Sequence, residues 1–119
     1  MRKLPHQYLT CNSPPKPLTR NWVRGIFLVR ESAIERAICQ HAKSVGVLQF
    51  KFTSPNRAGV PDRIFLFPDR RVVFMEMKTP TGRLSRLQEN EIRIIKKYGH
   101  SVYVVDSVEQ GKEIINSYL

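Results

Sequence analysis

Three charged residues lie in a stretch that otherwise has the composition of a sheet core. Asp62 follows Pro61, and Glu76 and Lys78 stand two apart in the apolar run that begins at Val72. Side chains of a strand alternate between its faces, so Glu76 and Lys78 leave the same face. Charges are costly to bury unless they are paired or bind a metal. We therefore expect these three residues to carry chemistry.

Residues 59–78 predict a hairpin that would bring the two acids together. Residues 63–67 and 72–78 have strand patterns, and the polar residues 68–71 between them form a turn. If this turn closes a hairpin, Asp62 lies beside Glu76. Two carboxylates and an ammonium at one point can hold a hard divalent cation and the water that it activates.

The predicted cation is Mg²⁺, with Mn²⁺ able to substitute for it. Asp62 would be the main ligand, Glu76 the second carboxylate, and the backbone carbonyl of Met77 a third oxygen ligand. Lys78 would orient the attacking water or help to deprotonate it, and would offset the growing negative charge. A structural interpretation stays open for each residue: Pro-Asp can simply form a turn, and Glu76 with Lys78 can be a surface ion pair.

These residues carry a resemblance to a known family. Pro61-Asp62 followed by Glu76-Met77-Lys78 resembles the signature of the PD-(D/E)xK nuclease superfamily, and residues 51–63 look like its VRR-NUC branch. The resemblance spans roughly residues 30–119. It implies an α/β (α+β) fold, with a restriction-endonuclease-like αβββαβ core in which helices flank a central mixed four-stranded sheet.

The resemblance also implies an activity. It points to a Mg²⁺-dependent endonuclease that hydrolyses DNA phosphodiester bonds. The implied substrates are branched DNA, flaps or Holliday junctions, in DNA repair, recombination or phage replication. Because one small chain cannot easily span two strands, resolution of junctions would require a homodimer with two active sites. Two alternatives are a type II restriction-like endonuclease and a non-catalytic DNA-binding module.

Further site residues come from the resemblance. It places a helix carboxylate, as a metal ligand, on Glu35, with Glu31 one turn earlier as the second choice; Glu35 could equally serve a capping box. Gln88 is placed beside the catalytic site, although it could instead cap a helix with Ser85. Lys51 is expected to face the catalytic pocket. Nucleic-acid phosphate contacts are predicted for Lys51 and for four arginines, Arg57, Arg63, Arg83 and Arg86, each of which could also be solubilising charge.

Local patterns predict the elements that position these residues. Ser32 with Glu35 predicts a capping box that opens a helix ending near Gly46. Residues 47–53 alternate as a strand, with Leu48, Phe50 and Phe52 on one face. Ser85 with Gln88 predicts a second capping box and a helix to about residue 98. Residues 101–106 form a fourth strand, and a last helix follows Ser107. The first three strands are expected to form an antiparallel meander.

The charge distribution divides the chain. The 119 residues carry a net charge of +10; residues 1–30 hold six Lys or Arg and no acid, so residues 31–119 hold 14 basic and 10 acidic residues. We expect a basic, proline-containing arm over residues 1–30 and a VRR-NUC-like nuclease domain over residues 31–119. The apolar run at 26–29 could pack on the domain, add an edge strand or meet a second subunit. A basic surface suits an enzyme that attracts phosphate.

Composition also bears on where the protein works. No apolar run is long enough to cross a bilayer, and no apolar segment of signal-peptide type follows the basic start. Cys11 and Cys39 lack a metal-binding spacing, and we expect both to be reduced thiols. These features predict a cytoplasmic protein that is not secreted, acting in a bacterium or, as a phage or virus protein, in a host cell.

Overall fold

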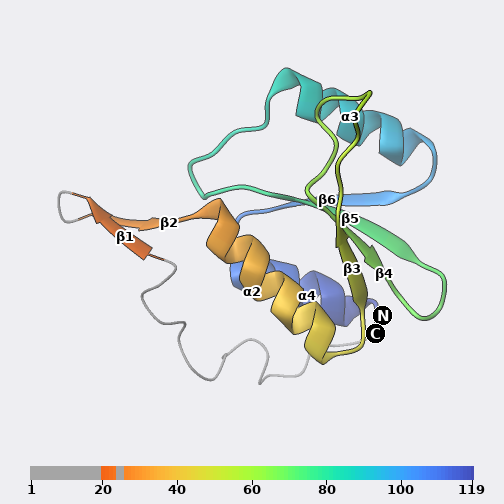
Figure 1. Ribbon diagram of the computed structural model, residues 1–119, viewed down its shortest axis with the longest axis horizontal. Coiled ribbons are helices and arrows are strands. Elements are labelled where there is room, and N and C mark those ends of the chain that lie inside the picture. Colours follow the sequence, from red (N-terminus) through yellow and green to blue (C-terminus); the bar gives the residue numbers. More distant parts are fainter. Residues whose placement is uncertain (1–19, 24–25) are drawn as a thin grey trace.

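The computed structural model describes residues 20–23 and 26–119, and side chains from residue 30 onward; predictions about residues 1–19, including Cys11, fall outside this range. Figure 1 shows the arrangement of its strands and helices. In chain order they are β1 (Arg20–Val23), β2 (Ile26–Val29), α2 (Glu31–Ser44), β3 (Leu48–Lys51), β4 (Arg63–Leu66), β5 (Val72–Met77), α3 (Arg86–Lys97), β6 (Ser101–Val105) and α4 (Val108–Ser117).

The central sheet is mixed and has the strand order β3-β4-β5-β6. Strands β3, β4 and β5 pair antiparallel, and β6 joins β5 in parallel after the crossover through α3. Two backbone hydrogen bonds close the tight turn between β4 and β5: the Phe67 amide donates to the Arg71 carbonyl, and the Arg70 amide donates to the Phe67 carbonyl. Arg70 has a positive φ of 76°. The α+β fold and the meander predicted from the sequence are therefore confirmed.

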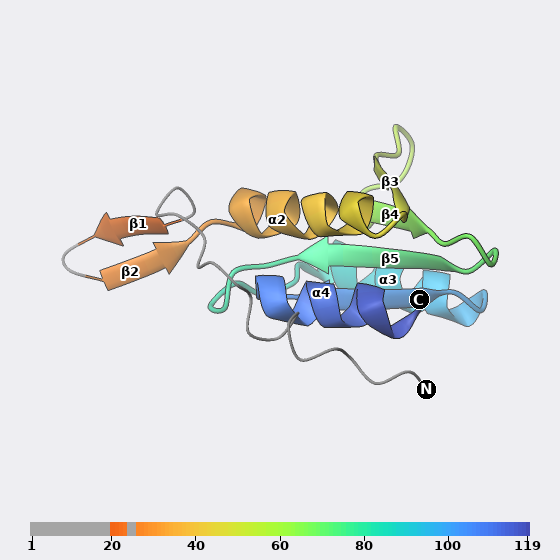
Figure 2. The ribbon, with the colours of Figure 1, turned by 90° about the horizontal axis from the view of Figure 1, so that it is seen from below.

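Helices cover both faces of this sheet. Helices α2 and α4 lie side by side on one face, and α3 lies on the other (Figure 2). Strand alternation sends Phe65, Val73, Met75 and Met77 toward α2 and α4, and all four are fully buried. They form one core with apolar residues of the two helices, Ile34, Ile38, Ala42 and Ile115. This core fixes the hairpin that carries the site.

Helices α2 and α4 are joined at two points. Gly111 of α4 lies against Ile38, so closely that a β-carbon at residue 111 would lie 2.2 Å from the Ile38 Cδ1 atom. One turn away, His41 Nε2 and Asn116 Oδ1 form a buried hydrogen bond of 2.9 Å. Burial lowers the pKa of His41, against the opposing effect of the Asn116 hydrogen bond. The two helices thus form one support under the sheet.

One of the two predicted capping boxes is wrong. Helix α2 begins at Glu31, so Ser32 lies inside its first turn, and the N-cap residue Arg30 forms no side-chain cap. The Glu35 carboxylate binds Lys51 and Arg63 instead of a backbone amide. At α3 the predicted capping box is present: the Ser85 side chain accepts a hydrogen bond from the Gln88 amide, and the Gln88 side chain accepts one from the Ser85 amide. Long-range ion pairing replaced a local motif in the first case and not in the second.

Strand β3 is shorter than predicted and its apolar side faces outward. Leu48 and Phe50 are 55% and 51% exposed, whereas Gln49 and Lys51 lie on the face that α2 covers. This orientation follows from the edge position of β3, because α3 packs over β6 at the opposite edge of the sheet. The predicted alternation of side chains in β3 is correct, but the apolar face of this strand is exposed and does not pack in the core.

Strands β1 and β2 form a separate two-stranded antiparallel sheet, with Trp22 opposite Phe27 in the register. Figure 1 shows it beyond the start of α2, away from the central sheet. Residues 26–29 therefore form a strand of this separate sheet and do not add an edge strand to the central sheet. None of the helices within the described residues is long and apolar enough to cross a membrane.

Candidate active site

The two predicted acids meet at the end of the β4–β5 hairpin. Arg63 pairs with Met75 in the antiparallel register, so the preceding residue Asp62 falls opposite Glu76. The Met77 amide donates a hydrogen bond of 2.9 Å to Asp62 Oδ2. The Asp62 charge in turn acts on Glu76. The two carboxyl groups are therefore neighbours on the same side of the sheet, and the charge of one acts on the other.

Glu76 is a buried carboxylate with one oxygen unused. The residue is 2% exposed, and its Oε1 atom is buried without a hydrogen-bond partner. Burial, followed by the charge of Asp62, raises the pKa of Glu76 to about 7, although Lys78 lowers it. Burying an unsatisfied carboxylate oxygen beside a second carboxylate is unfavourable unless a cation offsets the charge. The residues thus fit a divalent metal bound between them.

Lys78 lies beside this carboxylate. Its Nζ atom is 3.8 Å from Glu76 Oε2, and its side chain is 15% exposed. The backbone amide of Lys78 donates to the Val105 carbonyl, which fixes the end of β5 against β6. Strand alternation predicts that Glu76 and Lys78 leave the same face of the strand, and the structure places their charged groups together on that face.

Gln88 has both of the roles that the sequence left open. Its Oε1 atom accepts a hydrogen bond from the Ser85 amide at 2.8 Å, which completes the capping box. Its Nε2 group donates to Glu76 Oε2, also at 2.8 Å. The two interactions use opposite ends of one amide, so the start of α3 orients the buried carboxylate.

The loop before Asp62 is fastened to the same helix. Gly59 lies so close to α3 that a β-carbon there would come within 2.6 Å of the Leu87 backbone, and its φ is +87°. Two residues earlier, Arg57 binds Glu91 through two hydrogen bonds, of 3.0 Å and 2.6 Å. The loop therefore holds α3, and with it Gln88, against the hairpin.

Glu91 is a buried charged residue near the site that was not among the residues predicted from the sequence. It is 7% exposed and follows Gln88 by one turn on the buried side of α3, next to Ile92. A charge at a buried position of an amphipathic helix was the available signal. Its partner Arg57 is 34 residues away, which no local pattern could have indicated.

The two candidate helix carboxylates have different environments. Glu35 accepts hydrogen bonds from Lys51 at 3.0 Å and from Arg63 at 2.5 Å. Burial raises the pKa of Glu35, but these two cations outweigh it and lower the pKa overall. Glu31, at the start of α2, instead adds its charge to those that raise the pKa of Glu76. Glu35 is thus engaged by two cations, whereas Glu31 acts on Glu76 through its charge alone.

The predicted phosphate-binding cations fall into two groups. Lys51, Arg63 and Arg57 form ion pairs with carboxylates. Arg83 and Arg86 are exposed, and neither forms an ion pair with any described residue. They flank the start of α3, near Gln88, with their charge available to a ligand.

No group of three or more His, Cys, Asp and Glu side chains suited to a metal occurs among residues 20–23 and 26–119. The acid pair alone offers two carboxylates. The predicted third ligand is the backbone carbonyl of Met77 and not a side chain. The fit to a metal therefore rests on Asp62 and on the unused oxygen of Glu76.

The fold and this site define a nuclease of the VRR-NUC class. A model of the VRR-NUC domain matches residues 18–109, which begin before β1 and end in α4. The chain belongs to the VRR-NUC family.

Two relatives agree with this assignment. The chain is 36% identical over 80 residues to a protein named "Putative nuclease p44", from Acyrthosiphon pisum secondary endosymbiont phage 1; the match covers 67% of this chain and 86% of the relative. A solved structure named "VRR_NUC domain" superposes with a TM-score of 0.68 at 26% identity, covering 75% of this chain and 97% of the other. The predicted resemblance is therefore confirmed.

Proposed function

We propose that this nuclease is a Mg²⁺-dependent endonuclease that hydrolyses DNA phosphodiester bonds at the Asp62–Glu76 pair, with Mn²⁺ able to replace Mg²⁺. The observation that carries the proposal is the buried Oε1 atom of Glu76, which has no hydrogen-bond partner and lies beside a second carboxylate. An oxygen-rich, partly built site of this kind suits Mg²⁺, which keeps several waters and leaves positions for phosphate oxygens.

Each residue of the site has a separate role in this proposal. Asp62, Glu76 and the Met77 carbonyl would hold the metal, which lowers the pKa of a bound water and polarises the phosphoryl group. Asp62 is held in place by the Met77 amide, and Glu76 by Gln88. Lys78 would orient the attacking water or help to deprotonate it, and its charge would offset the negative charge that develops on the phosphate.

We assign the helix carboxylate to Glu31 in preference to Glu35. The charge of Glu31 already acts on Glu76, whereas the Glu35 carboxylate is engaged by Lys51 and Arg63. A ligand that first had to leave two cations would bind a metal at a considerable cost. Glu31 is exposed and carries no such cost.

The preferred substrate in this proposal is branched DNA, such as a flap or a Holliday junction, in repair, recombination or phage replication. The support is the family membership and the exposed arginines at the start of α3, which suit contact with phosphates. A homodimer with two sites would allow symmetric cutting of a junction. The protein would act in the cytoplasm of a bacterium or infected host cell.

Cleavage of a labelled four-way junction, compared with a linear duplex in Mg²⁺, Mn²⁺ or EDTA, tests these points. Symmetric cutting of the junction in either metal, and none in EDTA, is expected. Cutting of the linear duplex at particular sequences would favour a restriction-type enzyme. DNA that stays intact with every metal would leave a DNA-binding module.

The acid pair itself is tested by Asp62→Asn. This substitution removes one carboxylate charge but keeps an oxygen that can accept the Met77 hydrogen bond, so the fold should persist. We expect cleavage to fall by at least about 10³-fold, on the order of 4 kcal/mol in transition-state stabilisation. Junction affinity in EDTA serves as the control and should stay within a few-fold of the wild type. Full cleavage activity in the variant would contradict the assignment.

A further inference from the structure

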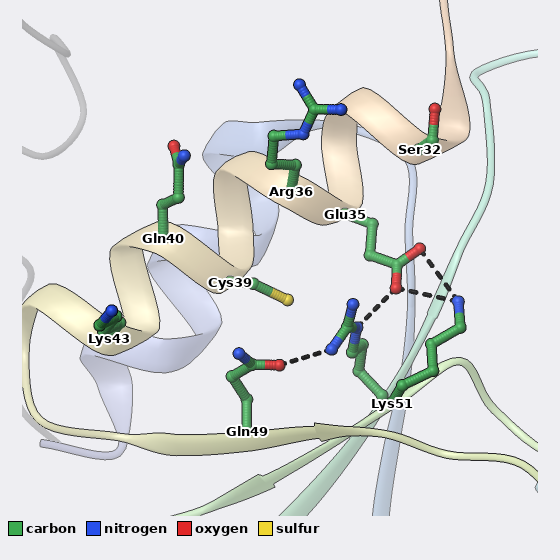
Figure 3. Close-up of a pocket in the computed structure, with 9 residues that line it drawn as sticks. Ser32, Glu35, Arg36, Cys39, Gln40, Lys43, Gln49 and Lys51 are labelled. Carbon is green, nitrogen blue, oxygen red and sulfur yellow. Dashed lines mark hydrogen bonds and ion pairs between the residues drawn. The ribbon is translucent and has the colours of Figure 1, made fainter.

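A pocket separate from the acid pair lies between α2 and strands β3 and β4 (Figure 3). Its volume is about 400 Å³, within the range of roughly 300–1,000 Å³ that is usual for small-ligand sites. Four cationic side chains and one carboxylate line it, which gives a net charge of +3; they are Arg36, Lys43, Lys51, Arg63 and Glu35. An excess of positive charge of this size favours an anionic ligand.

Glu35 engages two of the four cations at one end of the pocket. Its carboxylate binds Lys51 at 3.0 Å and Arg63 at 2.5 Å, and its side chain is only 14% exposed. Arg63 Nη1 also donates to Gln49 Oε1 at 2.6 Å, which holds the guanidinium in place. Figure 3 shows Glu35 reaching from α2 toward Lys51 on the strand below it. The cations are therefore ordered before any ligand arrives, and Glu35 cancels only one of their charges.

The other two cations lie along α2. Arg36 and Lys43 are both exposed, and seven residues, or two helical turns, separate them on one side of the helix. Among the described residues, no carboxylate forms an ion pair with either of them. They extend the positive charge from the ordered end of the pocket to its rim.

The pocket and the acid pair lie on opposite faces of the sheet. Arg63 pairs with Met75 and faces α2, where it binds Glu35, whereas Glu76 of the acid pair binds Gln88 of α3. Arg63 directly follows Asp62 in the chain, and successive residues of a strand point to opposite faces. A ligand of this pocket would therefore contact the protein outside the acid pair, around the end of β4.

We propose that this pocket binds a backbone phosphate of the DNA substrate, outside the acid pair, and that Glu35 limits the affinity of this contact. The phosphate is bound by the ordered pair Lys51 and Arg63 together with the rim cations of α2. That the ligand is DNA rests on the proposed function; that it is a phosphate anion rests on the pocket itself. Free phosphate is the competing source of the same chemistry.

A titration followed by ¹H–¹⁵N NMR tests the location. The ¹⁵N-labelled protein in EDTA receives either inorganic phosphate or a short single-stranded oligodeoxynucleotide without terminal phosphates. We expect the amides of Cys39, Gln49 and Lys51 to shift with the oligonucleotide, at concentrations at least tenfold lower than with inorganic phosphate. Shifts with inorganic phosphate alone would overturn the assignment to a DNA backbone. The absence of shifts in these amides with both ligands would overturn the site.

Charge variants test the energetics by junction binding in EDTA over a range of salt. Glu35→Gln should bind more tightly by several-fold and steepen the slope of log K against log salt by about one. Glu109→Gln, an exposed acid on α4, is the matched control and should leave both quantities unchanged. The double variant Arg36→Gln with Lys43→Gln should weaken binding by about tenfold and flatten the slope. Lys96→Gln with Lys97→Gln, at the end of α3, removes the same charge.

Equal effects in the pocket variants and their controls would mean that only overall charge matters, and would overturn the proposal. The proposed catalysis at the acid pair and the proposed phosphate pocket can be refuted independently of each other. If the wild type cuts no DNA with any metal but the pocket amides still respond to the oligonucleotide, the proposed catalysis fails and the pocket stands. If cleavage occurs and the pocket variants behave as their controls do, only the pocket assignment fails.

Discussion

The surroundings of Glu76 are unfavourable for its negative charge, and the same surroundings suit it to bind a metal ion. It is buried with an unused oxygen, beside Asp62. Without metal, its ionised form is repelled by a neighbouring carboxylate and is poorly solvated. With metal bound, both problems disappear. The same residue should therefore lower the stability of the metal-free protein and be required for cleavage.

The substitution Glu76→Gln separates these two effects. In EDTA at pH 8 the variant should be more stable than the wild type, by about 1–3 kcal/mol, because a buried charge is removed while the Gln88 contact can be kept. Addition of Mg²⁺ should raise the melting temperature of the wild type and not that of the variant. Thermal unfolding by circular dichroism measures both. A variant that is less stable than the wild type in EDTA would show that Glu76 is not under electrostatic strain.

A comparison of Glu31→Gln with Glu35→Gln identifies the helix carboxylate. We expect the Mg²⁺ concentration for half-maximal cleavage to rise by about tenfold in Glu31→Gln, because its charge acts directly on the acid pair. Cleavage rates over a range of Mg²⁺ concentrations provide the measurement. A larger rise in Glu35→Gln would return the metal-ligand role to Glu35, as the family resemblance first suggested.

Among the elements, the loop between β3 and β4 controls how α3 meets the hairpin. Gly59 touches the backbone of Leu87, and the next residue of α3, Gln88, holds Glu76. The contact leaves no room for a β-carbon. Any change that pushes the loop away from α3 should therefore move Gln88 and reach the catalytic carboxylate indirectly.

Gly59→Ala tests this arrangement, with Gly46→Ala as its matched control. Both glycines have a positive φ, near +87° and +81°, so both variants should lose about 1–2 kcal/mol of stability from backbone strain. Only residue 59 would also collide with α3, since nothing lies within 4 Å at residue 46. We expect cleavage to fall at least tenfold in Gly59→Ala at a temperature where both variants are folded. Similar cleavage by the two variants would show that the contact does not position the site.

The elements also show what a sequence can and cannot predict. The β4–β5 hairpin and the Ser85 capping box were predictable because their partners are close in the chain and have strict periods or spacings. The Ser32 box was wrong because Glu35 found distant cations, and the Arg57–Glu91 pair was missed for the same reason. Strand alternation placed Leu48 and Phe50 on one face but could not say which face the helices would cover.

At the scale of the whole molecule, the junction of α2 with α4 ties the two ends of the nuclease fold together. His41 of α2 and Asn116 of α4 are both buried and bonded to each other. Because burial lowers the pKa of His41, the folded protein takes up this proton at a lower pH than the unfolded chain, whose histidine titrates near 6.5. Between these two pKa values the unfolded chain binds more protons, so stability must fall as the pH falls through this window.

This prediction is measured by urea unfolding between pH 7.5 and 5. The free energy of unfolding of the wild type should decline as the pH drops below about 6.5, and it should level off once His41 is also protonated in the folded state. In His41→Gln, which removes the titrating group, the decline over this range should be smaller. An identical decline in the two proteins would assign it to other groups.

The register of the hairpin also restricts how the gene can change. Asp62 and Glu76 are partners only because equal lengths of chain run from each of them to the turn. One codon inserted within β4 or β5 would rotate one acid to the far side of the sheet, whereas codons added at the tip near Arg70 would leave the pairing intact. Length variation among homologous genes should therefore be concentrated at this tip, which also makes it the natural place to attach a tag or a reporter.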